Sequence, residues 1–311
     1  MIVTVTLNLA LDVTYRVPRL TPGATHRVAV DQRAGGKGVN VARVVRTLGE
    51  DAVVCGFAGG GTGRLALAEL ESAGIPARAT AIGGETRRNV AVVDTQAGEA
   101  TGFWEPGPAV TDAEWATLLR DVEGELRGAR ALVLSGSLPA GVPGDAYAVL
   151  CERAALAGVP VVLDADGDAL RLGLAGTPEV VKPNREELAT VTATADVREG
   201  AARLRELGAR SVVASLGADG LVAVTEEGSW RARPAHPAAG NATGAGDAVV
   251  AALALGLARN RPWPERLAEA VALSSAAVAA PLAGSFDDDE YHRQRAGASV
   301  ETLPMAAVGE G

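Results

Sequence analysis

Short runs of β-branched and aliphatic residues alternate with helical patterns along the C-terminal two thirds of the chain. From about residue 111 onward, strand-like runs and segments with helical spacing mostly alternate, although two strand-like runs follow each other at 211–224. The strand-like runs are 131–134, 159–163, 180–181, 211–214 and 220–224, and the helical segments are 112–127, 145–157, 186 onward, 198–207, 247–258 and 264–280. Repeated units of this kind build a doubly wound, mostly parallel sheet with helices on both faces. The sequence therefore predicts an α/β fold.

The N-terminal third departs from this alternation. Residues 2–7 and 52–57 resemble core strands, and residues 39–48 and 64–73 resemble helices. Two further hairpins, at about 12–31 and 87–104, have no helices between their strands, so we expect them to form a small β-sheet lid. We expect one domain over residues 1–311 that carries this lid.

Charge and cysteine content exclude several classes of protein. The chain has 311 residues with 29 basic and 38 acidic side chains, a net charge of −9, which argues against nucleic-acid or anionic membrane partners. Cys55 and Cys151 lie far apart, so neither a disulfide framework nor a zinc site is expected. The longest apolar run, 248–258, is about half a membrane span. The N-terminus lacks the basic segment of a signal peptide, and we expect a cytoplasmic protein.

The segment 241–247, NATGAGD, is the strongest functional signal. A turn of small residues leads into the apolar helix predicted at 247–258, so free backbone N–H groups at a helix N-terminus can bind an anion. Asp247 lies in the first turn, where its carboxylate can accept a proton from an attacking hydroxyl. Taken alone, the pattern also fits an ordinary helix start in which the glycines serve only the turn.

Two other motifs carry the only lysines of the chain. Lys37 lies in AGGKGVNVA (34–42) and Lys182 in VKPNREEL (181–188), whereas the other 27 of the 29 basic residues are arginine. Three glycines around a lysine indicate a site for an anion or a hydroxyl-rich ligand. VKPNREEL directly follows a strand, where ligands bind in open parallel sheets, although a helix start capped by Asn184 also fits it. The P-loop and dinucleotide-binding glycine patterns are both absent.

The ordered motifs resemble those of the ribokinase-like (PfkB) carbohydrate kinases. Asp12, GGKGVNVAR, TRRN, SGSLP, VKPNREEL, SLGADG and NATGAGD follow one another in the order of that family, from about residue 2 to 285. The spellings TLN (6–8), GGKG (35–38) and SGSLP (135–139) resemble its phosphosugar branch, which contains 1-phosphofructokinase, tagatose-6-phosphate kinase and the minor 6-phosphofructokinase. The resemblance implies an αβα sandwich with a β lid, ATP and Mg²⁺ as cofactors, and a phosphotransferase that acts on an alcohol group.

The resemblance also implies roles for individual residues. Asp247 matches the catalytic base, and Gly244, Ala245 and Gly246 match the anion hole. The sugar-binding positions are matched by Asp12, Gly35, Gly36, Asn40 and Ser137, with Lys37, Arg87 and Arg27 as contacts for the phosphate already on the substrate. The ATP-binding positions are matched by Lys182, Asn184, Ser215 and Gly217, and Glu187 and Asp164 match acidic positions that support the metal through water.

These matches imply ATP-dependent phosphorylation of a ketohexose phosphate, with fructose 1-phosphate as the first candidate. Leu9, the Asn241-Ala242-Thr243 run and Asp164-Ala165-Asp166 depart from the 1-phosphofructokinase spelling, so tagatose 6-phosphate and fructose 6-phosphate remain alternatives. A kinase of an unphosphorylated sugar or nucleoside would have no use for the cations of Lys37 and Arg87. A non-catalytic sugar-phosphate sensor would not need an intact GAGD loop.

The predicted lid also suggests an oligomer. Its two hairpins carry apolar residues at Val13, Val28, Val90, Val92, Phe103 and Trp104, and so small a sheet is rarely stable with a bare face. We expect one face to cover the sugar and the other to meet the same sheet of a second subunit, forming a homodimer.

Overall fold

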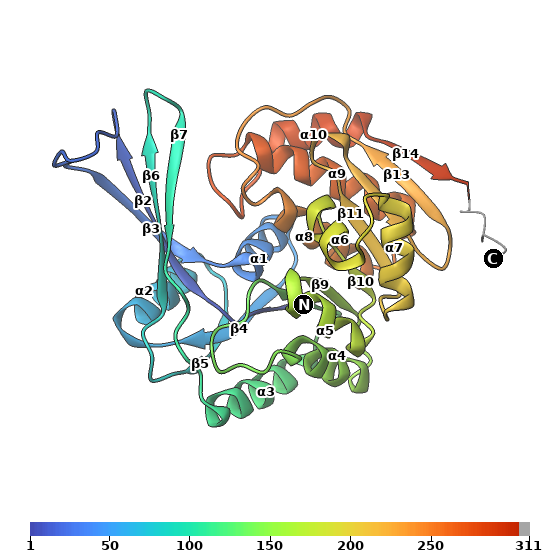
Figure 1. Ribbon diagram of the computed structural model, residues 1–311, viewed down its shortest axis with the longest axis horizontal. Coiled ribbons are helices and arrows are strands. Elements are labelled where there is room, and N and C mark those ends of the chain that lie inside the picture. The colour runs from blue at the N-terminus through green and yellow to red at the C-terminus, as the bar shows by residue number, and fades with distance from the viewer. Residues whose placement is uncertain (305–311) are drawn as a thin grey trace.

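The structure, a computed structural model, describes residues 1–304 and contains two β-sheets of different size (Figure 1). Within that range the larger sheet has ten strands in the order β14-β13-β12-β11-β10-β9-β8-β1-β4-β5. The strands are β1 (Ile2–Thr6), β4 (Ala52–Ala58), β5 (Ala77–Ala81), β8 (Ala131–Ser135), β9 (Val161–Asp164), β10 (Val180–Val181), β11 (Ser211–Ser215), β12 (Leu221–Val224), β13 (Ser229–Arg233) and β14 (Ser299–Leu303). In this spatial order, all neighbouring strands from β11 to β5 are parallel. At the other end of the sheet, β12, β13 and β14 pair in antiparallel fashion.

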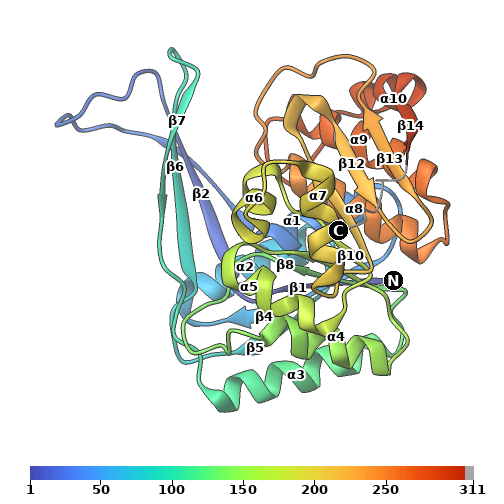
Figure 2. The same cartoon turned by 45° about the vertical axis from the view of Figure 1, so that its right-hand side comes forward.

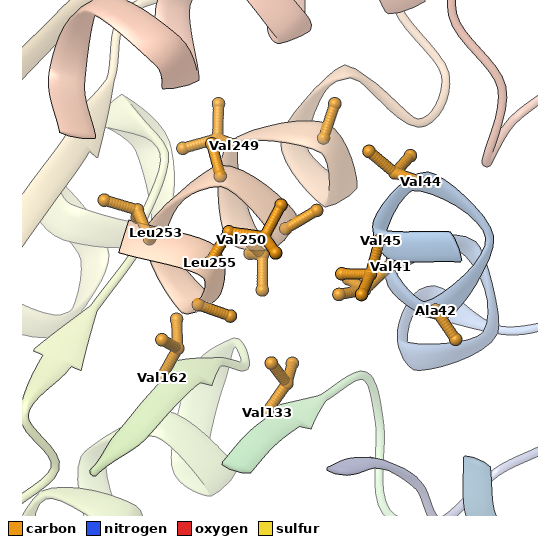
Figure 3. Packing of buried hydrophobic residues seen from close by; sticks show 14 of the residues in the cluster. Val41, Ala42, Val44, Val45, Val133, Val162, Val249, Val250, Leu253 and Leu255 are labelled. Carbon is orange, nitrogen blue, oxygen red and sulfur yellow. The ribbon is translucent and has the colours of Figure 1, made fainter. Parts of the chain in front are cut away.

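Helices cover both faces of the larger sheet. They are α1 (Lys37–Thr47), α2 (Gly60–Ser72), α3 (Asp112–Leu126), α4 (Ala146–Leu156), α5 (Gly167–Gly173), α6 (Arg185–Thr192), α7 (Val197–Glu206), α8 (Ala245–Ala258), α9 (Trp263–Ala279) and α10 (Asp288–Gly297), with short 3₁₀ turns η1 (Leu174–Gly176) and η2 (Gly217–Asp219). Because successive strand residues point to opposite faces, the core is divided into two clusters. Val133 and Val162 pack with α1 and α8 on one side (Figure 3), and Leu132 and Leu163 pack with α3 and α4 on the other.

The smaller sheet stands beside the larger one (Figure 2) and has the strand order β3-β2-β6-β7. Its strands are β2 (Ala10–Val17), β3 (Ala29–Gly35), β6 (Arg87–Asp94) and β7 (Glu99–Trp104). Two antiparallel hairpins are joined by the parallel pair β2–β6. Helix α2 packs against β2 and β3 at the base of this small sheet.

The predicted α/β fold class is confirmed, with differences in individual elements. The strand expected at 26–30 lies at Ala29–Gly35, because it forms the edge of the small sheet and its polar residues Asp31 and Arg33 take one face. The helix expected at 64–73 begins at Gly60, since the Glu85 carboxylate accepts hydrogen bonds from the Gly61 and Thr62 amides at its N-terminus. The sequence patterns did not indicate β5, β13, β14 and α5.

Candidate active site

A cavity of about 1320 Å³ lies between the two sheets, at the carboxyl ends of β9, β10 and β11. This edge is where open parallel sheets bind their ligands. Most of the residues predicted for the site line it: Asp12, Gly36, Lys37, Asn40, Arg87, Asp164, Lys182, Asn184, Glu187, Ser215, Gly217, Gly244, Ala245, Gly246 and Asp247. Segments from the whole length of the chain therefore meet at one cavity.

The N-terminus of α8 faces this cavity. Gly244 adopts a φ of +88°, and a Cβ atom there would come within 2.8 Å of the Ala283 backbone, so only glycine fits the turn. The rest of α8 is buried from Asp247 to Leu257, which fixes the helix against the larger sheet. The Ala245 N–H donates a hydrogen bond to the Ala242 carbonyl oxygen, whereas the Gly244 and Gly246 N–H groups lie at the positive end of the helix dipole, where an anion can bind.

Asp247 is buried in the first turn of α8, with a relative exposure of 6%. Asn40 Nδ2 donates a hydrogen bond of 2.8 Å to Asp247 Oδ2. Burial, reinforced by the nearby Asp164 charge, raises the pKa of Asp247 to about 7, although Asn40, Lys37 and Lys182 act in the opposite direction. A carboxyl group whose pKa lies near neutrality can accept a proton from a hydroxyl.

Asp164 lies between the two lysines of the chain. Its Oδ2 atom is 3.5 Å from Lys37 Nζ and its Oδ1 atom is 3.2 Å from Lys182 Nζ, and its side chain is 1% exposed. Burial opposes the Lys37 charge, but Asp164 and Asp247 keep the pKa of Lys37 above its usual value. Lys182 also lies near the anion turn, because a Cβ atom on Gly246 would be 3.6 Å from Lys182 Nζ. The two ammonium groups therefore gather at the Asp247 end of the cavity.

The small sheet supplies a second group of polar side chains. Asn89 Nδ2 donates a hydrogen bond of 2.8 Å to Asp12 Oδ1, and burial raises the pKa of Asp12. Gly35 leaves room for this carboxylate, since a Cβ atom there would lie 2.1 Å from Asp12 Oδ2. Arg87 donates from Nε and Nη2 to the carbonyl oxygen of Asn8.

A smaller cavity of about 350 Å³ contains Ser137. It is lined by Thr6, Asn8, Gly36, Lys37, Arg87, Trp104, Ser135, Gly136, Ser137 and Asp166. Asn8 Nδ2 donates a hydrogen bond of 3.0 Å to Ser137 Oγ. Lys37 and Arg87 line both cavities, which places the smaller one beside the part of the site predicted for the sugar.

Three other residues predicted for ATP, Asn184, Ser215 and Gly217, line the larger cavity but not the smaller one. Asn184 and Glu187 form a reciprocal cap at the start of α6, where each side chain accepts a hydrogen bond from the other residue's backbone N–H. The same segment therefore starts a capped helix and also lines the cavity. Ser215 ends β11 and Gly217 begins η2 with a φ of +62°.

The structure separates Arg27 from the other predicted residues and adds several that the sequence analysis missed. Arg27 is exposed between β2 and β3 and lines neither cavity. Asn8, Arg33, Asn89 and Trp104 line one or both cavities. Asn8 and Asn89 occur in the quoted TLN and TRRN motifs, which could have indicated them, whereas no local signal marks Arg33 or Trp104.

No cluster of three or more histidine, cysteine or acidic side chains suited to hold a metal ion occurs within residues 1–304. In the same range, no helix combines the length and the apolarity that a membrane span requires.

Comparison with known proteins identifies the family. Residues 4–289 match the pfkB family of carbohydrate kinases. The chain belongs to the PfkB family. This kinase is 38% identical to a 1-phosphofructokinase of Xanthomonas campestris over 79% of its own length and 81% of the relative. It is 34% identical to a 1-phosphofructokinase of Escherichia coli K12 over 92% of its own length and 93% of the relative.

Solved structures show the same fold. A mutant of Escherichia coli phosphofructokinase-2 superposes with a TM-score of 0.88 at 33% identity, covering 95% of this kinase and 98% of the other chain. Other structures of that protein are described as a complex with fructose-6-phosphate and as a tetrameric inhibited form. The PfkB kinase described here is therefore a phosphotransferase with an alcohol group as acceptor, with the ribokinase-like α/β fold.

Proposed function

We propose that this kinase transfers the γ-phosphoryl group of ATP to the free hydroxymethyl group of fructose 1-phosphate, yielding fructose 1,6-bisphosphate. The observation that carries the proposal is the meeting of Asp247 and the Gly244–Gly246 turn with Asp12 and Arg87 in one cavity. The relatives named 1-phosphofructokinase support the choice of sugar. Tagatose 6-phosphate and fructose 6-phosphate are the alternative acceptors. We also propose that the enzyme is cytoplasmic.

In this proposal Asp247 accepts the proton of the attacking hydroxyl while that oxygen bonds to the γ-phosphorus and the bond to the β,γ-bridging oxygen breaks. Asn40 orients the carboxylate through its 2.8 Å hydrogen bond. The Gly244 and Gly246 amides and the ammonium group of Lys182 stabilise the negative charge of the transferring group, which is where most phosphoryl-transfer catalysis arises. Asp12 binds sugar hydroxyls, and Arg87 contacts the phosphate already on the sugar.

The residues present fit a magnesium ion held mainly by the nucleotide phosphates. Mg²⁺ prefers oxygen ligands and usually keeps several waters, with one or two protein carboxylates. One carboxylate oxygen of Glu187 accepts the hydrogen bond that caps α6. Both Asp164 oxygens are buried, accept no hydrogen bond of good geometry and lie 3.2 and 3.5 Å from the Lys182 and Lys37 ammonium groups. Glu187 and Asp164 would hold the ion through water, and its charge would neutralise the phosphates.

We further propose that the small sheet acts as a lid of the single kinase domain and covers the sugar. The polar face with Asp12 and Asn89 borders the larger cavity. Arg27 lines neither cavity, so its predicted contact with the substrate phosphate is not part of this proposal.

A screen of acceptors tests the substrate. ADP release would be measured with fructose 1-phosphate, fructose 6-phosphate, tagatose 6-phosphate, fructose and ribose at matched concentrations. We expect the highest kcat/KM with fructose 1-phosphate. A higher value with another phosphorylated ketohexose would change the sugar but keep the class, and a higher value with fructose or ribose would overturn the proposal. Absence of ADP release with every acceptor would indicate a sensor.

A further inference from the structure

Trp104 is an exposed indole at the boundary of the two cavities. It ends β7, the edge strand of the small sheet, and its relative exposure is 67%. Trp115, Trp230 and Trp263 are between 2% and 9% exposed. Trp104 lines both the larger and the smaller cavity. Because removing so large an apolar surface from water is favourable, an indole exposed there is suited to be covered by a ligand.

The strand register places Trp104 beside polar groups that can bind hydroxyls. Trp104 pairs with Asn89, and Asn89 pairs with Asp12 on the next strand. Directly paired residues on neighbouring strands project from the same face of a sheet. Asp12 and Asn89 are already linked by a 2.8 Å hydrogen bond, so a carboxylate, an amide and an indole form one row facing the cavity.

Gly102 provides the space in which the indole lies. A Cβ atom at this position would be 1.6 Å from Trp104 Cζ3 and 1.8 Å from Cη2. The ring therefore occupies the place of a missing side chain two residues before it on the same face of β7. Any larger residue at position 102 would displace the ring.

The surroundings of Trp104 point to the sugar rather than the nucleotide. The smaller cavity includes Arg87 and Ser137 but none of Lys182, Asn184, Ser215 and Gly217. A sugar has a polar rim of hydroxyls and an apolar face of C–H groups, so it matches polar groups next to an aromatic ring. We propose that Trp104 forms a wall of the sugar subsite and packs against the C–H face of the bound sugar phosphate. This inference rests on the proposed function, which places a sugar phosphate in the site.

Quenching of tryptophan fluorescence by acrylamide tests the contact directly. In the wild type, fructose 1-phosphate should reduce the quenching, because the single strongly exposed tryptophan becomes covered. The change should be lost in Trp104→Phe and kept in Trp115→Phe, which alters a buried residue on α3 that lines neither cavity. Unchanged quenching in the wild type at a concentration that saturates turnover would overturn the inference.

Steady-state kinetics test how much Trp104 contributes to binding of the sugar phosphate. We expect Trp104→Ala to raise KM for fructose 1-phosphate about 3- to 30-fold, the scale of an aromatic contact together with part of its buried area, and to change KM for ATP by less than about twofold. Trp104→Phe should recover most of the affinity, and Gly102→Ala should shift KM in the same direction as Trp104→Ala while every tryptophan remains. Equal changes in both KM values, or a changed oligomeric state in Trp104→Ala, would assign Trp104 to another role.

The test of Trp104 can be distinguished from the test of the proposed function. If the acceptor screen selects a different sugar, the same variants are measured with that sugar, and the proposal for Trp104 is judged on that result. If fructose 1-phosphate is the acceptor but Trp104→Ala leaves its KM unchanged, the proposed function holds and the inference about Trp104 fails.

Discussion

The Asp247 carboxyl group is buried, yet the proposed reaction requires its ionised form. Asp247→Asn keeps the size of the side chain and removes the base, so we expect kcat to fall about 10²- to 10⁴-fold. The affinity for ATP should stay nearly unchanged, because Asp247 acts on the acceptor hydroxyl. Steady-state kinetics together with calorimetric titration of ATP would measure both. A variant that keeps more than a tenth of the wild-type kcat would show that Asp247 is not the base.

The raised pKa of Asp247 also predicts how the rate depends on pH. The pKa of Asp247 is about 7, so its ionised form predominates above that pH and kcat should rise as the pH increases through 7. Asn40 donates to the ionised carboxylate and lowers its pKa. In Asn40→Ala the acidic limb should therefore move to higher pH by about one unit, the scale of one hydrogen bond to a charged group. A limb that moves to lower pH, or does not move, would contradict this assignment.

Arg87 tests the substrate class. Arg87→Ala should raise KM for fructose 1-phosphate about 10- to 150-fold, the equivalent of one charge-assisted contact, and should change KM for fructose much less. Arg88→Ala is the matched control, since Arg88 pairs with Glu105 and lines neither cavity. Equal losses with both sugars in Arg87→Ala would place Arg87 outside the phosphate site.

At the scale of the elements, a partly buried ion pair between α1 and α2 also binds the backbone of β3 in the small sheet. Arg43 of α1 donates to Glu69 of α2, and Glu69 Oε2 also accepts a hydrogen bond of 2.9 Å from the Ala34 amide of β3. Arg43 is 8% exposed, so removing the charge of Glu69 leaves a buried guanidinium without its counter-ion. We expect Glu69→Gln to lower the free energy of unfolding by about 1–3 kcal/mol.

Urea denaturation measures this loss, and Glu71→Gln provides the control. Glu71 lies two residues further along α2, where its side chain is exposed and makes no ion pair within the described chain. If both variants unfold at the same urea concentration, the contact between Arg43 and Glu69 does not fasten the small sheet.

The elements also show how much of the fold and of the site could be predicted from the sequence. Alternating strand and helix patterns predicted the fold class, and the resemblance to the PfkB kinases implied which motifs would meet at one site. Contacts between distant segments were not predictable: nothing in the sequence indicated that the Lys37 ammonium group lies 3.5 Å from Asp164. The pairing of Trp104 with Asn89 depends on strand register, which no local pattern specifies. Strands β13 and β14 each have five residues, three of them polar or charged, so their signal was weak.

At the scale of the whole molecule, the small sheet has an outer face that is only partly covered. Val13 is buried against the core cluster above α2, but Phe103 and Val30 are 59% and 49% exposed. Phe103 pairs with Val90, so these two side chains share the face opposite to Asp12 and Trp104. A structural relative from Escherichia coli is described as a tetramer in its inhibited form. An exposed apolar face on a four-stranded sheet favours association.

We therefore predict a homodimer formed through the outer faces of the small sheets. A two-fold contact uses the same surface on both subunits, so it covers both exposed faces at once. Light scattering coupled to size exclusion at micromolar concentration should give twice the monomer mass, with and without substrate. Phe103→Glu should shift the mass to that of a monomer, because a charge would be buried at the contact. Leu156→Glu, on the 86% exposed Leu156 of α4, should leave the dimer intact. A wild-type monomer under both conditions would mean that solvent covers the outer face.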